Sequence, residues 1–151
     1  MERFSLKKSR MLSICIAVSL YEQYAENNVM TASPMELVRM LYRFIIDNLG
    51  EASRCTITGD IEGRGKAVSK ATEGFLELLT SLDHNQGGEV SRNLAELYGY
   101  MASRVLDGHV NQVSEPFQEV ERLMSTLLAG WENLGVQQIP EAAYAPISAS
   151  F

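Results

Sequence analysis

Apolar residues recur at steps of three and four along most of this chain, and this spacing constrains its fold more than any other feature. Such spacing places apolar side chains along one face of an α-helix. No stretch alternates polar and apolar residues over a useful length, so strands are not expected. No proline falls inside a helical stretch. The sequence therefore predicts an all-α fold.

The first helix is expected to run from Pro34 to about Thr58. Ser33 has the N-cap position, proline is tolerated as the first helical residue, and Glu36 follows the cap by three residues, as in a capping box. Gly59 is a suitable end, because glycine readily adopts the left-handed conformation that closes helices. Local signals thus predict both ends of this helix.

A second helix is expected after Asp60, which is a good N-cap residue. The sequence DHNQGG at 83–88 predicts a turn, and a third helix is expected to begin near Glu89. The apolar stripe of the second helix is Ile61, Val68, Phe75, Leu79 and Leu82, and that of the third is Val90, Leu94, Leu97, Met101 and Val105.

A fourth helix is expected after a loop at HVNQV, 109–113, with Ser114 as its N-cap. Four helices joined by short connections indicate an antiparallel up-down four-helix bundle, which we assign to a domain over 21–134. The apolar stripe of the fourth helix is Phe117, Val120, Met124, Leu127, Trp131 and Leu134.

The two ends of the chain differ from this bundle. Residues 1–20 form an atypical extension, in which a basic stretch with a local charge of +3 over 1–10 precedes a ten-residue apolar run. This run is too short to span a bilayer. The extension is compatible with a signal peptide, with a start of translation at Met11 or later, or with a short helix that packs on the bundle. The stretch 135–151 is expected to be a flexible tail.

Composition argues against several functions. The net charge of −6 disfavours nucleic acid, because a phosphate backbone requires a basic surface. Cys15 and Cys55 lack metal spacing and are expected to be reduced thiols. Neither His84 nor His109 follows a Glu by three residues, so a metal centre is not expected. We therefore expect a protein with no metal, no cofactor and no catalytic activity.

The stretch GDIEGRGKA, 59–67, has some likeness to a phosphate-binding loop. It lacks the required spacing between glycines, and its lysine is followed by Ala67 instead of Ser or Thr. Its glycines are better interpreted as loosening the first turn of the second helix.

The helix over 34–58 is apolar almost all round, which exceeds the single stripe that a bundle helix needs. The surplus is interpreted either as packing under the N-terminal segment or as a groove for a partner's amphipathic helix. The two are compatible if the segment covers the groove until a partner displaces it. The candidate groove residues are Val38, Met40, Leu41, Tyr42, Ile45, Leu97, Met101, Leu123 and Leu128.

Three stretches resemble the flagellin export chaperone family, FliS. They are YEQYAENNVMTASPMELVRMLY at 21–42, SLDHNQGGEVSRNLAELYGYMASRVL at 81–106, and EVERLMSTLLAGWENL at 119–134. A generic bundle is not expected to carry all three in this order and at these distances. Residues 1–20 and the glycine-rich second helix depart from the family pattern.

The resemblance implies a cytoplasmic chaperone that binds the disordered C-terminal region of flagellin and presents it to the export gate protein FlhA, with no stable membrane insertion. It also implies that the segment before the first long helix folds over part of the client site and contacts the gate. The residues to which this role is assigned are Tyr21, Tyr24, Val29 and Met30. A helical adaptor for another secreted coiled-coil protein and a periplasmic helical bundle are the alternatives. Whether the client-free protein forms a homodimer is left open.

Overall fold

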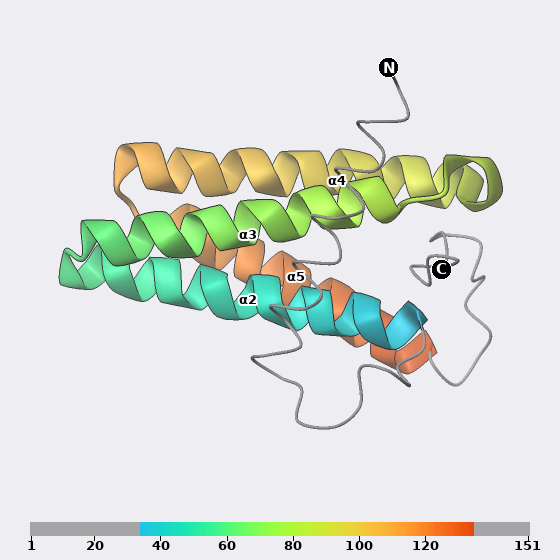
Figure 1. The fold of residues 1–151 in the computed structure, drawn as a ribbon, viewed down its shortest axis with the longest axis horizontal. Coiled ribbons are helices and arrows are strands. Elements are labelled where there is room, and N and C mark those ends of the chain that lie inside the picture. Colours follow the sequence, from blue (N-terminus) through green and yellow to red (C-terminus); the bar gives the residue numbers. More distant parts are fainter. Residues whose placement is uncertain (1–33, 135–151) are drawn as a thin grey trace, which may run out of the picture.

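The structure is a computed structural model, and it describes residues 34–134. Four helices occupy almost all of this part of the chain (Figure 1). They are α2 at Pro34–Thr58, α3 at Ile61–Ser81, α4 at His84–Asn111 and α5 at Glu115–Leu134. The prediction of an all-α bundle is confirmed. Ser33, the N-terminal segment and the C-terminal tail lie outside the described residues.

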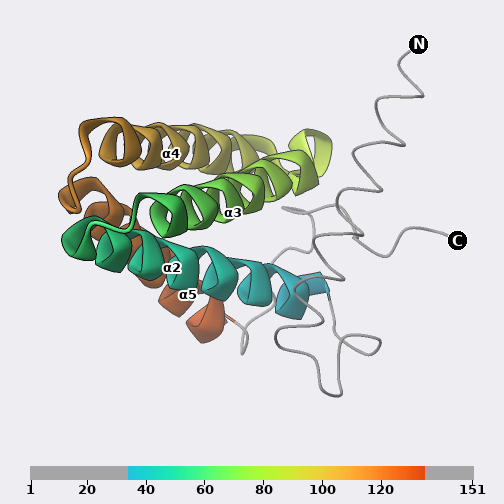
Figure 2. The same cartoon turned by 60° about the vertical axis from the view of Figure 1, so that its left-hand side comes forward.

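The helices lie in two layers with each consecutive pair antiparallel (Figures 1 and 2). α2 packs against α3 and α5, and α4 packs against the same two helices. The α2–α3 and α4–α5 connections lie at one end of the bundle (Figure 1). The α3–α4 connection, the start of α2 and the end of α5 lie at the other end. This is the up-down topology that short connections produce.

The core holds most of the apolar stripes that the helical spacing predicts, and two tyrosines lie at its centre. Two stripe residues, Ile61 and Val90, are exposed instead of buried. Tyr42 of α2 and Tyr98 of α4 are fully buried, although their helices are diagonal neighbours. Their ring centroids are 6.2 Å apart at an interplanar angle of 73°, and their hydroxyl groups are hydrogen-bonded to each other. The largest core side chains include Phe75, Phe117, Leu49, Leu78, Met101 and Met124.

The α2–α3 connection is built as the sequence predicts. Gly59 has φ of +76°, the left-handed conformation that ends a helix at glycine. The Asp60 side chain accepts a hydrogen bond of 2.9 Å from the backbone N–H of Gly63, which makes it the N-cap of α3. The two helices therefore reverse direction over two residues, Gly59 and Asp60.

The two connections beside α4 are shorter than predicted. The expected turn at 83–88 contains one helical turn, because Asp83 accepts hydrogen bonds from the backbone of Asn85 and Gln86. Gly88, with φ of +54° and ψ of −126°, then kinks the helix before its long regular part. This combination of a positive φ with a strongly negative ψ is readily available only to glycine, so the kink depends on this residue.

The prediction of a loop at 109–113 is wrong for residues 109–111, since α4 continues through Asn111. Gln112 closes the helix in the left-handed conformation, and the Val113 backbone N–H donates to the Gly108 carbonyl at 3.1 Å. This is the hydrogen-bond pattern of a Schellman motif. A tertiary contact from His109 to Arg64 of α3 also holds this last turn. Local propensity alone did not reveal either contribution.

Candidate functional site

Five of the nine predicted groove residues are core residues in this structure. Val38, Leu41, Tyr42, Ile45 and Met101 are each at most 4% exposed. The surplus apolar surface of α2 is largely consumed because this helix packs against two neighbours, α3 and α5. These five side chains cannot contact a partner while the bundle keeps this conformation.

The other four predicted residues are half-buried and do not share one boundary. Met40 follows Arg39, which faces the α2–α5 side and donates to the Trp131 carbonyl at 3.5 Å, but successive helix residues point in different directions, so Met40 does not share that side. Leu128 is one turn from Trp131 on the same side. Leu97 and Leu123 belong instead to the α4–α5 boundary. The structure therefore does not unite the predicted set into one surface.

Three polar side chains define how α4 and α5 face each other. The Tyr100 hydroxyl donates to Glu119 Oε1 at 2.6 Å, and Arg104 donates to Glu119 Oε2 through Nη2 at 2.6 Å and Nε at 3.0 Å. These hydrogen bonds, from Tyr100 first and then Arg104, lower the pKa of the Glu119 carboxyl. The carboxylate in turn raises the pKa of the Tyr100 hydroxyl. We call Tyr100, Arg104 and Glu119 the polar lock, and these hydrogen bonds determine which faces of α4 and α5 meet.

An apolar strip continues from this polar lock. Leu97 lies one turn before Tyr100, and Leu123 lies one turn after Glu119, so the antiparallel helices bring the two leucines to the same boundary. Val90 and Leu127 extend the strip by up to two further turns in the same direction. We call these residues the α4–α5 strip: Val90, Leu97, Tyr100, Leu123 and Leu127.

The α4–α5 strip is accessible. Val90 and Tyr100 are 51% and 49% exposed, and the three leucines are half-buried. α4 is the longest described helix, yet it packs less extensively on its neighbours than α2 does. Apolar surface is therefore available beside α4 for another apolar helix face.

Sequence reasoning did not place Val90, Tyr100 or Leu127 in the candidate site. It assigned Val90 and Leu127 to core stripes and gave Tyr100 no role. One signal was available: Tyr98 and Tyr100 are two positions apart, so they point in nearly opposite directions from a helix, and only one of them can face the core.

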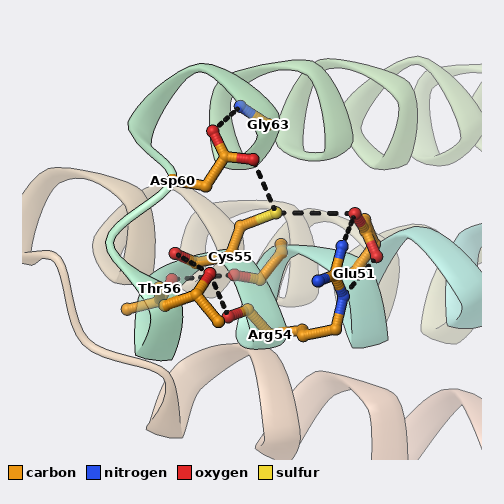
Figure 3. Close-up of polar contacts among 8 residues, drawn as sticks. Glu51, Arg54, Cys55, Thr56, Asp60 and Gly63 are labelled. Atoms are coloured by element: carbon orange, nitrogen blue, oxygen red, sulfur yellow. Dashed lines mark hydrogen bonds and ion pairs between the residues drawn. The ribbon is translucent and has the colours of Figure 1, made fainter.

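The stretch that has some likeness to a phosphate loop has a structural role (Figure 3). A Cβ atom at position 63 would clash with Asp60 Oδ2 and lie 2.9 Å from the sulfur of Cys55, so a larger residue here would displace the capping carboxylate and the thiol. Cys55 is fully buried and its Sγ lies 3.5 Å from Glu51 Oε1 and 3.9 Å from Asp60 Oδ2. Burial first, and then Glu51, raises the pKa of this thiol. The cluster joins two helices and leaves the sulfur inaccessible.

The histidines do not come together. His84 is exposed at the start of α4. His109 lies near the end of the same helix, and its Nδ1 accepts a hydrogen bond of 3.3 Å from Arg64 Nε. Within residues 34–134 no group of three or more His, Cys, Asp or Glu side chains could hold a metal ion. The four described helices include none that is long and apolar enough to cross a membrane. Tyr21, Tyr24, Val29 and Met30 lie outside the described part of the chain.

Comparison with known proteins finds one family whose match covers most of the chain. The family described as flagellar protein FliS matches residues 17–138. The flagellar secretion chaperone FliS of Salmonella typhimurium is 33% identical over 129 residues, covering 84% of this chain and 93% of that protein. That of Escherichia coli is 34% identical over 109 residues, covering 71% and 79%, and that of Bacillus subtilis is 28% identical over 112 residues, covering 74% and 83%.

Proposed function

The chain belongs to the FliS family of flagellar proteins, and from this premise we propose that it is a flagellar secretion chaperone whose client is flagellin. It binds the disordered C-terminal region of flagellin in the cytoplasm. There it prevents premature polymerisation and delivers the client to the flagellar type III export gate.

The observation that carries the proposal is the accessible apolar α4–α5 strip. From Val90 to Tyr100 it extends over about 15 Å of helix, at about 1.5 Å per residue. An amphipathic client helix presents apolar anchors at i, i+3, i+4 and i+7, which fit a surface of this length. The half-buried leucines Leu97 and Leu123 are the central anchors on the chaperone side.

The physical mechanism is coupled folding and binding. Flagellin ends carry apolar helical faces that are made for the filament, and these faces self-associate when they are free. Covering them buries on the order of 1,000–3,000 Å² and costs about 2–5 kcal/mol for ordering the client. The complex is then tight enough to protect the client and weak enough to release it. The net charge of −6 keeps the chaperone soluble.

Contact with the export gate protein FlhA is assigned to Tyr21 and Tyr24. Its support is the family resemblance alone, since both residues lie outside the described range. Replacing both tyrosines with alanine should weaken capture of the loaded chaperone by the cytoplasmic part of FlhA, while flagellin binding is retained. Equal capture of the variant and the wild type would remove this assignment.

The client proposal is tested with a C-terminal flagellin peptide. Titration calorimetry should give a one-to-one complex, and circular dichroism should report a gain of helix on mixing. A Leu97→Ala, Leu123→Ala double variant should bind at least tenfold more weakly, because about 1.4 kcal/mol of lost apolar contact corresponds to a factor of ten.

Leu76→Ala is the matched control. Leu76 lies on α3, is 58% exposed and is not part of the α4–α5 strip. Its loss should leave the affinity unchanged. Thermal unfolding of each variant separates weaker binding from a damaged bundle. The absence of both binding heat and helix gain with the wild type would contradict the proposal that flagellin is the client. Equal weakening of peptide binding by Leu76→Ala would contradict the proposal that the α4–α5 strip is the binding site.

A further inference from the structure

Exposed apolar side chains collect at one end of the bundle, away from the α4–α5 strip. Eight large apolar residues are exposed within 34–134, and five of them lie on the α2–α3 and α4–α5 connections or within about two turns of them. We call this set the connection-end patch: Ile57, Ile61, Leu106, Val110 and Val113. The most exposed of them, Ile57 and Val110, are both 73% exposed.

Two tertiary hydrogen bonds join the helices of one connection to the helices of the other. Arg64 of α3 donates to His109 of α4 at 3.3 Å; Ile61 lies one turn before Arg64, and Val110 follows His109 in the sequence. On the other side Gln118 of α5 donates to the Ser53 hydroxyl of α2 at 3.4 Å. Figures 1 and 2 show both connections at the same end of the bundle.

The charged groups around the patch are mainly acidic. Exposed carboxylates on residues 57–66 and 106–115 belong to Asp60, Glu62, Asp107 and Glu115. The basic residues of these ranges are Arg64, which is buried, and Lys66, which is ion-paired to Glu62 at 2.9 Å. Arg104, one turn away, is 3.6 Å from Asp107. An acidic border around an apolar centre suits an occupant that is apolar and basic.

We propose that the connection-end patch is the docking site of residues 3–20 of this same chain. This segment holds Arg3, Lys7, Lys8 and Arg10 with no acidic residue, followed by the apolar run MLSICIAVSL at 11–20. It combines positive charge, which is opposite to the charge of the acidic border, with apolar surface that matches the apolar centre of the patch. The family match begins at residue 17, so most of the segment lies outside the matched range.

The chain is long enough for this contact. α2 starts at the opposite end of the bundle, and its 25 residues extend about 37 Å at about 1.5 Å per residue. The 13 residues 21–33 reach about 43 Å when extended, at about 3.3 Å per residue. Covalent connection also raises the effective concentration of the segment at the patch.

Charge disfavours two other occupants. The C-terminal stretch 135–151 has a single charged residue, Glu141, which the acidic border would repel. A second copy placed end to end would bring two acidic borders together, and like charges at an interface oppose association. The segment 3–20 is the part of the chain whose charge is opposite to that of the border.

The native cysteine Cys15 provides the test, because it lies within the segment. A nitroxide on Cys15 of the full-length Cys55→Ala protein should broaden the backbone amide signals of residues 57–61 and 110–113. An Ile61→Glu, Val110→Glu variant should lose this broadening, since both side chains are highly exposed and their replacement leaves the core intact. The matched control Leu76→Glu should keep it.

A second measurement uses unlabelled protein, so it does not depend on the nitroxide. Replacing Lys7, Lys8 and Arg10 with glutamate should shift the same amide signals. Broadening that is absent from the patch, together with unchanged shifts in this variant, would overturn the proposal. Broadening that passes from a labelled copy to an unlabelled one in a mixture would assign the patch to a dimer contact and would also overturn it.

Discussion

Gly74 of α3 packs closely against Ile45 of α2, and its replacement by alanine tests the packing of these two helices. A Cβ atom at this position would lie 2.5 Å from Cγ1 and 3.0 Å from Cδ1 of Ile45. Cγ1 is bonded directly to the Cβ of Ile45, so only a change of χ1 can move it within the side chain. A helix strongly favours one χ1 rotamer for isoleucine. The clash therefore has to be relieved by a strained side chain or by separating the helices.

The size of the effect follows from two opposing contributions. Overpacking a core costs about 1–3 kcal/mol, whereas alanine is about 1 kcal/mol better than glycine inside a helix. We expect Gly74→Ala to lower the free energy of unfolding by about 1 kcal/mol. Gly65→Ala, in the same helix, has no atom within 4 Å of its new Cβ and should raise it by up to about 1 kcal/mol.

Urea unfolding of the full-length protein, followed by circular dichroism, measures both variants. The midpoints should move in opposite directions with an unchanged dependence on urea, because neither change alters the surface exposed on unfolding. An Ile45→Ala, Gly74→Ala double variant should lose less stability than the sum of the single changes. A Gly74→Ala protein as stable as the wild type would refute the packing argument, and so would a Gly65→Ala protein that is less stable.

Three further outcomes are expected. Asp60→Ala should lower the free energy of unfolding by about 1 kcal/mol in the urea assay, since the N-cap of α3 is lost. Glu119 has a lowered pKa in the folded protein, so the stabilisation from its carboxylate is present above its unfolded pKa and is lost as the pH falls through the folded pKa. Glu119→Gln should therefore reduce the decrease of the urea midpoint at acid pH. A variant whose midpoint changes with pH as the wild type's does would contradict the role given to the polar lock. In a Cys15→Ser protein, Cys55 should react with a thiol reagent slowly when native and rapidly in urea, because it is fully buried and its pKa is raised; fast reaction of the native protein would contradict its burial.

The extent of the helices could be predicted because their signals are local. The periodicity of apolar residues and the left-handed glycine at Gly59 act within a few neighbouring residues. The capping aspartate at Asp60 acts over the same short range. The start of α4 was missed although its signal is local, since Asp83 caps Asn85 and Gln86. Its end was missed because a longer-range contact adds to weak propensity. The closure at Gln112 and the contact from Arg64 to His109 both hold this last turn.

The candidate site could be predicted only in part. The sequence included Leu97 and Leu123, which the structure leaves half-buried. It also included Val38 and Ile45, which the bundle buries. A helix that is apolar almost all round offers no periodicity from which its outward face can be chosen.

By itself, the sequence determined the fold class, the helices and the family resemblance, all of which depend on patterns read along the chain. Only the tertiary structure decided which apolar surface stays accessible. α2 has two packing partners, so its surplus is covered, whereas the α4–α5 strip and the connection-end patch remain exposed. The patch includes Ile57 and Val110, which lie far apart in the sequence and belong to helix ends that the antiparallel arrangement brings to the same end of the bundle. Exposure is a property of the assembled bundle, because each helix can be covered only by its neighbours.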